Sequence, residues 1–221
     1  MSQTLNRFFK SRFQFSLFLL FVIYLVGITT VLMGHADSLM LLTPYNLIFA
    51  SGLILFNAEK IDKKYLFWFL LLAIAGFLIE FAGIVTGRIF GIYSYGNGLG
   101  IKLLEVPLII GVNWSILVFS TAAIVYSFHW HRVLKAVFAA SMMVAYDILL
   151  EPVAIRYDFW QWEGGSIPFQ NYLAWWVIAF VMLLGVFSFV KKLKNPIAIY
   201  VLAVQTLFFA ILIVKDGMKV F

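Results

Sequence analysis

Long runs of apolar residues constrain this chain more than any other feature of its sequence. A helix that crosses a bilayer needs about 17–25 mostly apolar residues, and it satisfies its backbone hydrogen bonds internally. Seven runs are long enough, at Phe13–Met33, Leu39–Asn57, Tyr65–Ile84, Leu104–Ser127, Leu134–Ala154, Asn171–Val190 and Ile197–Val214. The sequence therefore predicts an all-α integral membrane protein with seven transmembrane helices.

The composition leaves no room for a separate soluble domain. Of the 221 residues, 64% are hydrophobic and only 12% are charged, so residues 1–221 are expected to form a single polytopic membrane domain. Cysteine is absent, which excludes disulfides, thiolate metal sites and a cysteine nucleophile. The net charge is +6, and the lysines and arginines gather between the apolar runs. This distribution indicates membrane topology rather than nucleic-acid binding.

Lysine and arginine are distributed unevenly between the two sides that the seven runs define. Eleven of the 16 basic residues fall on the side that holds the N-terminus. These are Arg7, Lys10, Arg12, Lys60, Lys63, Lys64, Arg132, Lys135, Lys191, Lys192 and Lys194. Because cytoplasmic loops carry the excess of basic residues, we expect the N-terminus inside and the C-terminus outside.

Four acidic residues lie within or beside the apolar runs. Glu80 falls near the outer end of the third run, and Glu105 begins the fourth. Asp147 and Glu151 occupy the outer third of the fifth run. A carboxylate at membrane depth is costly, so by default it marks a functional site. The four acids fall in one leaflet, which predicts that they share a pocket.

Asp147 and Glu151 are four residues apart and therefore lie on one face of a helix. Two carboxylates in a low-dielectric site cannot both ionise cheaply, so at least one should hold a proton at neutral pH. A protonated acid beside an ionised one is an acid/base pair. The structural alternative is that either residue caps backbone freed by Pro152, or pairs with Arg88 or Arg156.

The acid-bearing segments form an apparent internal repeat. An offset of 67 residues aligns Glu80 with Asp147, Phe90 with Tyr157, Tyr93 with Trp160 and Tyr95 with Trp162, and after a gap Trp114 aligns with Trp175. Both units run from an acid through an aromatic-rich loop to a tryptophan. The pattern predicts a parallel repeat of helix pairs three–four and five–six, with the site between them.

Aromatic residues surround these acids in the sequence. Tyr93, Tyr95, Trp160, Trp162 and Trp175 are expected near the outer interface, where an aromatic belt would explain each ring singly. Ring faces also stabilise a nearby cation by about 0.5–2 kcal/mol each, and an aromatic slot accepts a flat or polyene substrate. Of the three histidines, His129 and His131 flank Trp130 at a cytoplasmic turn far from the acids, so a histidine-rich di-iron site is excluded.

Two stretches carry a resemblance to a known family. The first begins at Glu80 and reads EFAGIVTGRIFGIYSYGNGLGIKLLEVPLIIGVNW; the second begins at Asp147 and reads DILLEPVAIRYDFWQW, followed by NYLAWW from Asn171. Both resemble the CruF-type carotenoid biosynthesis proteins, which are integral-membrane carotenoid 1,2-hydratases. The resemblance runs from about Leu66 to Val190. Glu105 departs from it, because a small residue is expected before Val106-Pro107.

The resemblance implies the addition of water to the C1=C2 bond of an acyclic carotenoid end group. This chemistry needs an acid for C2, an electron-rich slot for the cation at C1, and a base-oriented water, but no metal or other cofactor. Asp147 or Glu151 is the expected acid, Glu80 the residue that orients water, and Arg88 or Asn171 the group that holds the carboxylates. The expected substrate-binding residues are Arg88, Tyr93, Tyr95, Glu105, Asn113, Trp114, Trp160, Trp162, Asn171 and Trp175.

The resemblance further implies a multi-pass protein of the bacterial cytoplasmic membrane. Its partners would be a lipid-soluble carotenoid, membrane lipids and other carotenoid enzymes, with no nucleic acid. Two alternatives stay open. A polyene cyclase similar to lycopene cyclases would use the same cation but close a ring. A proton-coupled transporter would use buried acids as a relay, although such a relay should extend across the whole membrane depth.

Overall fold

The computed structural model describes residues 2–59 and 62–219, with side chains described from Lys10 onward. Within this part of the chain there are eight α-helices, four short strands and one 3₁₀ turn at Glu163–Gly165. The helices are α1 (Ser2–Leu32), α2 (Ala36–Met40), α3 (Thr43–Asn57), α4 (Lys63–Thr86), α5 (Leu108–Tyr126), α6 (Arg132–Arg156), α7 (Phe169–Phe189) and α8 (Pro196–Asp216). The all-helical expectation is confirmed, and the apolar helices make this a membrane-embedded protein.

Six of the described helices, rather than seven, are long and apolar enough to cross a membrane. The exception is α3, whose 15 residues span about 22 Å against a hydrocarbon core of about 30 Å. A single helix over Leu39–Asn57 was the wrong prediction, because α2 ends at Met40 and the chain turns before α3 begins at Thr43. Pro44 then lies in the first turn of α3, where its missing N–H costs nothing.

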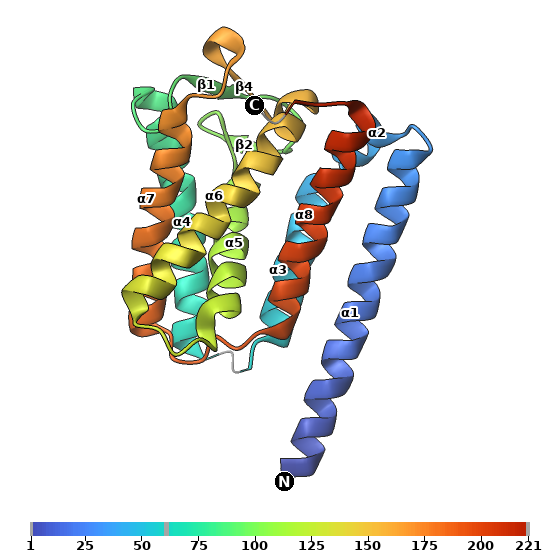
Figure 1. The fold of residues 1–221 in the computed structure, drawn as a ribbon, viewed down its shortest axis with the longest axis vertical. Coiled ribbons are helices and arrows are strands. Elements are labelled where there is room, and N and C mark those ends of the chain that lie inside the picture. Colours follow the sequence, from blue (N-terminus) through green and yellow to red (C-terminus); the bar gives the residue numbers. More distant parts are fainter. Residues whose placement is uncertain (1, 60–61, 220–221) are drawn as a thin grey trace.

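The long helices run alternately in opposite directions, and all the strands lie at one end of the bundle (Figure 1). We call this end the strand end. Helix α5 occupies the centre, and every residue from Asn113 to Ala123 is buried. A helix that is apolar all round suits such a position. In contrast, α1 lies at the edge of the bundle and exposes large apolar side chains such as Phe18 and Leu25.

Glycine allows α4 and α5 to approach each other closely. A Cβ atom placed on Gly111 of α5 would lie 2.2 Å from the backbone oxygen of Ala73 on α4. From the other side, a Cβ on Gly76 of α4 would lie 2.7 Å from Trp114 of α5. These two contacts fix the spacing between the helix that carries Glu80 and the helix that carries Trp114.

Two connections cover the strand end, residues 87–107 and 157–168, and we call them together the strand cap. Strand β1 (Tyr93–Tyr95) of the first pairs antiparallel with β4 (Trp160–Trp162) of the second. Beyond the ladder, the amide of Gly96 donates to the carbonyl of residue 159, that of Gly98 to the carbonyl of residue 158, and that of Glu163 to the carbonyl of Ile92. The two connections therefore form one continuous cover.

The predicted start of the fourth span at Leu104 was wrong. Strands β2 (Lys102–Leu103) and β3 (Val106–Pro107) form a hairpin there, and α5 begins only at Leu108. Leu104 and Glu105 make its two-residue turn with φ values of 52° and 65°, as a type I′ turn requires. Glu105 is thus an exposed turn residue rather than part of a helix.

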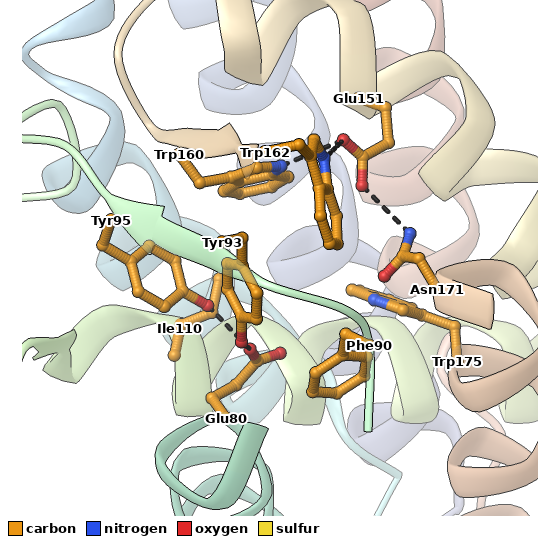
Figure 2. Close-up of a pocket in the computed structure, with 10 residues that line it drawn as sticks. All are labelled: Glu80, Phe90, Tyr93, Tyr95, Ile110, Glu151, Trp160, Trp162, Asn171 and Trp175. Carbon is orange, nitrogen blue, oxygen red and sulfur yellow. Dashed lines mark hydrogen bonds between the residues drawn. The ribbon is translucent and has the colours of Figure 1, made fainter. Parts of the chain in front are cut away.

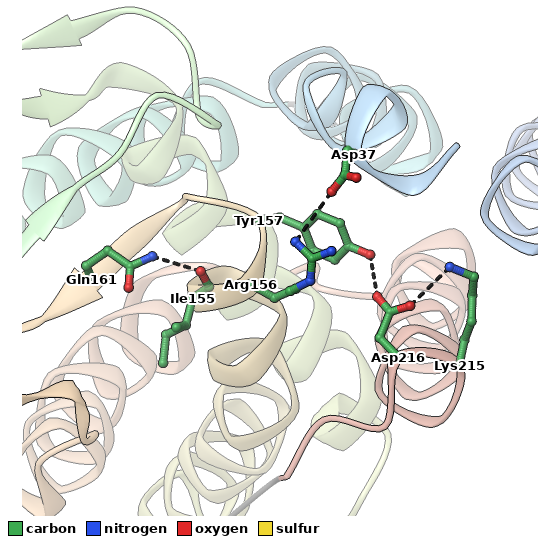
Figure 3. A network of polar contacts seen from close by, with 7 residues as sticks. All are labelled: Asp37, Ile155, Arg156, Tyr157, Gln161, Lys215 and Asp216. Atoms are coloured by element: carbon green, nitrogen blue, oxygen red, sulfur yellow. Dashed lines mark hydrogen bonds and ion pairs between the residues drawn. The ribbon is translucent and has the colours of Figure 1, made fainter. Parts of the chain in front are cut away.

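Polar contacts at the strand end also join α2, α6 and α8 (Figure 3). Arg156 at the end of α6 forms an ion pair with Asp37 of α2, with 3.5 Å between Nη1 and Oδ1. Next to it, the Tyr157 hydroxyl donates to Asp216 of α8 at 2.7 Å. Arg156 is therefore occupied at the surface and does not pair with Asp147 or Glu151.

Candidate functional site

Glu80, near the end of α4, is buried beneath the strand cap and accepts three hydrogen bonds. The hydroxyls of Tyr93 and Tyr95 donate to its Oε2 at 2.5 and 2.8 Å, and the Trp114 indole N–H donates to its Oε1 at 3.0 Å. The residue is only 3% exposed. Hydrogen bonds to a charged group contribute about 1.5–3 kcal/mol each, so three of them offset much of the cost of burying an ionised carboxylate.

Glu151, on α6, has a matching set of three donors. The indole N–H groups of Trp160 and Trp162 donate to its Oε2 at 3.0 and 2.9 Å. The Asn171 amide, at the start of α7, donates to its Oε1 at 3.0 Å. Each buried glutamate is therefore held by side chains from one strand of the cap and from the helix that follows that strand.

The β1–β4 ladder explains why four aromatic rings point the same way. Alternate residues of a strand face the same side, and Tyr93 and Tyr95 lie opposite Trp162 and Trp160 in the register. All four rings face into the bundle, while the intervening Ser94 and Gln161 are exposed. The ladder thus delivers two hydroxyls and two indoles to one site, where the Tyr93 and Trp162 rings lie 5.0 Å apart.

The two tyrosines of the ladder remain hydrogen-bond donors. Burial raises the pKa of the Tyr93 phenol far above its ordinary value, and the nearby Glu80 carboxylate raises it further. The same two causes raise the pKa of Tyr95. Both phenols therefore keep their protons, and each can present its O–H to Glu80.

Asp147 lies behind Glu151, and Asn171 links the two. The Asn171 amide nitrogen donates to Asp147 Oδ2 at 3.0 Å as well as to Glu151. Asp147 is fully buried, and its second oxygen, Oδ1, has no hydrogen-bond partner among the described residues. The acid pair expected from the i, i+4 spacing is present, with an amide bridging its two members.

A small cavity lies between the two glutamates (Figure 2). It measures about 20 Å³ and is lined by Glu80, Phe90, Tyr93, Tyr95, Ile110, Glu151, Trp160, Trp162, Asn171 and Trp175. A polar cavity needs a volume of roughly 10–15 Å³, measured in this way, to hold one water molecule, so this cavity accommodates a single water. Trp175 stacks on Trp114 with 4.2 Å between ring centroids, which closes one wall.

The structure brings most, but not all, of the predicted site residues together. Eight of them line the cavity, and Trp114 and Asp147 reach it through hydrogen bonds to Glu80 and Asn171. Three lie elsewhere. Arg88 is exposed beyond the end of α4, Glu105 is in the β2–β3 turn, and Asn113 is buried in α5 outside the cavity lining.

Phe90 and Ile110 line the cavity although they were not among the predicted site residues. Phe90 reaches it because Gly83, one turn after Glu80, leaves space there: a Cβ on Gly83 would lie 2.7 Å from the Phe90 ring and 3.2 Å from the Tyr93 hydroxyl. Two sequence signals pointed to this ring, its alignment with Tyr157 in the 67-residue repeat and a glycine three residues after a buried acid, but neither placed it in the site. Ile110 carried no signal, since one apolar residue in an apolar run looks like any other.

No group of three or more His, Asp or Glu side chains within the described part of the chain converges as metal ligands would. The polar groups that do converge are three carboxyls held by neutral donors. Such a site can hold and move protons, orient a water molecule and surround a cation with ring faces.

Comparison with known proteins identifies the family. A family model described as "Carotenoid biosynthesis protein" matches residues 14–219, nearly the whole chain. No curated protein and no solved structure matches the chain significantly. The match covers every helix that contributes to the site and indicates an enzyme that acts in carotenoid biosynthesis. The chain is a member of the carotenoid biosynthesis protein family.

Proposed function

We propose that this protein is a carotenoid 1,2-hydratase of the CruF type, which adds water to the C1=C2 bond of an acyclic end group. The observation that carries the proposal is the cavity between Glu80 and Glu151. It has room for one water, it touches both carboxyls, and six of the ten residues that line it are aromatic. Hydration needs an acid, a water and a shielded cation in one place, and the side chains around this cavity include groups suited to all three. Because the present volume holds the water alone, the end group enters beside the water when the surrounding rings move apart.

The Asp147–Glu151 pair supplies the proton in this mechanism. Glu151 is the member that lines the cavity, so it delivers the proton to C2, and the π electrons of the C1=C2 bond form the new C–H bond. A tertiary cation remains at C1. Asp147, joined to Glu151 through Asn171, shares the negative charge left behind and acts as a positioning residue.

Aromatic rings and Glu80 complete the reaction. The faces of Trp160, Trp162 and Trp175 stabilise the cation at C1, by about 0.5–2 kcal/mol for each ring that faces it. The water oxygen attacks C1, and Glu80 accepts the proton that the water loses, which gives the tertiary alcohol. Before the next turnover this proton returns to Glu151 through the incoming water. Protons and charge then balance, and no redox partner is required.

We also propose seven passes through the bacterial cytoplasmic membrane, with the N-terminus inside and the strand end outside. The seventh is α3, counted together with α2 and the turn that precede it, because α3 alone is shorter than the hydrocarbon core. The alternating direction of α1 and α3–α8 supports this topology (Figure 1). So do Lys63, Lys64, Arg132 and Lys135, which lie at the opposite end from the strands.

The proposed helix-pair repeat has its own support in the ladder. Residues that the 67-residue offset equates are exchanged across it, since Tyr93 lies opposite Trp162 and Tyr95 opposite Trp160. A two-fold axis through the ladder would produce this exchange. Trp114 and Trp175, the two tryptophans that the repeat equates, stack face to face.

The product mass tests the proposed function. Expressed in a host that accumulates lycopene, the chain should yield a pigment heavier by one water, as measured by mass spectrometry of the extract. A γ-carotene host provides a second substrate with one acyclic end. A product of unchanged mass but altered absorption would mean a cyclase. Pigment that is unmodified in both hosts would contradict a polyene-modifying enzyme altogether.

A further inference from the structure

A second recess lies in the half of the bundle that the candidate site does not use. We call it the side groove. It has a volume of about 480 Å³, within the range of small-molecule sites, and is formed by residues of α1, α2, α3, α6 and α8. No charged side chain lines it. Its rim includes exposed apolar residues such as Val22 and Val26 of α1 and Leu42 before α3, so it opens toward lipid.

Among the mostly apolar residues of the groove, four neutral polar side chains form two hydrogen-bonded pairs. The Tyr24 hydroxyl of α1 donates to Asn46 Oδ1 of α3 at 3.0 Å. The Tyr146 hydroxyl of α6 lies 3.4 Å from Gln205 Oε1 of α8. Tyr24, Tyr146 and Gln205 are each more than nine-tenths buried. A polar side chain at membrane depth is costly unless it forms hydrogen bonds, either to a neighbouring helix or to a ligand.

Helix packing alone does not use all of these hydrogen bonds. The Asn46 amide is engaged at its oxygen only, and its nitrogen has no partner among the described residues. If the amide were turned round, its oxygen would be left over instead. Asn46 is half-buried at the groove wall, so one end of the amide is available to a ligand with a neutral hydroxyl or carbonyl.

The groove is also adjacent to the candidate site. Tyr146, which lines the groove, and Asp147, which bonds to Asn171 of the site, are consecutive residues of α6. Consecutive residues of a helix face directions about 100° apart, so α6 separates the two recesses. Under the proposed function, a hydroxylated polyene is released into the bilayer directly beside this groove.

We propose that the side groove binds an acyclic polyene that already carries a hydroxyl group, with the hydroxyl at Asn46. This inference rests on the proposed function for the identity of the ligand. The apolar walls accept the chain, and Asn46 distinguishes a hydroxylated end from a hydrocarbon end. The groove would thus hold the product, or a substrate whose first end has already been hydrated.

Purified full-length protein in nanodiscs tests this directly. The probes are an acyclic C40 polyene with one tertiary hydroxyl and the same polyene with hydrogen in its place, and both have saturated end groups that cannot be hydrated. We expect the hydroxylated probe to be retained at about one molecule per chain and to show induced circular dichroism in the visible range. Because the hydroxylated probe is supplied ready-made, binding can be measured whether or not the protein hydrates anything.

Two comparisons locate the bound ligand: Gly27→Phe against Gly27→Ala, and Asn46→Leu against the unmodified chain. A Cβ on Gly27 would lie 3.5 Å from Phe208 and 3.8 Å from Leu39, which is ordinary contact, so Gly27→Ala should bind normally. Gly27→Phe should fill the groove and abolish retention. Asn46→Leu should reduce the preference for the hydroxylated probe by about three- to tenfold relative to the unmodified chain, the effect of one hydrogen bond.

Specific outcomes would overturn the inference. Equal retention by Gly27→Phe and Gly27→Ala would mean that the polyene binds elsewhere. Equal retention of both probes, unchanged by Asn46→Leu, would mean that the groove holds any hydrocarbon, including lipid tails. If the hydroxylated probe binds in the groove but no host pigment gains water, the proposed function fails while the binding site remains.

Discussion

Glu151→Gln should lower the rate of pigment hydration by about two to four orders of magnitude, the usual contribution of a general acid. The amide has the size of the carboxyl and can still accept from Trp160 and Trp162, but it cannot deliver a proton to carbon. The measurement is the initial rate of formation of the water-adduct pigment in nanodiscs. The amount of folded protein should stay near that of the unmodified chain.

Glu105→Gln is the matched control for this substitution. It makes the same chemical change at an exposed hairpin turn outside the cavity, so the rate should be unchanged. If Glu151→Gln kept full activity, Glu151 would not be the acid. In that case Asp147→Asn would show whether the proton comes from the other member of the pair.

Gly111→Ala should destabilise the protein by about 3 kcal/mol or more, the upper part of the range for overpacked cores. The added methyl group would lie 2.2 Å from the Ala73 backbone oxygen, and a backbone atom cannot move aside by changing rotamer. The helices α4 and α5 would have to separate, which would also move Glu80 away from Trp114. The loss can be measured as a lower midpoint of unfolding in detergent.

Gly52→Ala is the control for the glycine substitution. Gly52 is exposed within α3, and nothing lies within 4 Å of a Cβ placed on it. Alanine favours a helix over glycine by about 1 kcal/mol, so this variant should be as stable as the parent or slightly more stable. Equal midpoints for the two variants would show that α4 and α5 are not held as closely as described.

The helical fold was largely predictable, because it follows from the length and polarity of each segment. The exception at α3 shows the limit of that reasoning. Leu39, Met40, Leu41 and Leu42 are all apolar, so hydropathy cannot distinguish a continuous helix from a helix that stops at Met40 and starts again at Thr43. The hairpin at Leu104–Glu105 escaped prediction because neither residue is a usual choice for positive φ.

Site residues were predictable where burying a charged side chain carries a large free-energy cost. They were not predictable where only the three-dimensional arrangement brings a residue to the site. Glu80, Asp147 and Glu151 are too costly to bury without a reason, so the sequence identifies them. The aromatic residues were expected in loops, and the strands that turn alternate rings toward the acids were not predicted. Arg88 was expected beside the acids from its position in the sequence alone. The αL turn at Gly87 ends α4 just before it and leaves its side chain exposed.

The strand cap bears on which pigment concentration, that in water or that in lipid, sets the reaction rate. Its two connections are joined by the β1–β4 ladder and by further backbone bonds, so together they cover the candidate site at the strand end. Under the proposed function the reactant is insoluble in water, so it exchanges in two dimensions, with the lipid phase as its solvent. The relevant Michaelis constant is then a mole fraction in lipid. Adding empty vesicles should slow the enzyme by surface dilution even when the molarity of pigment in the tube stays the same.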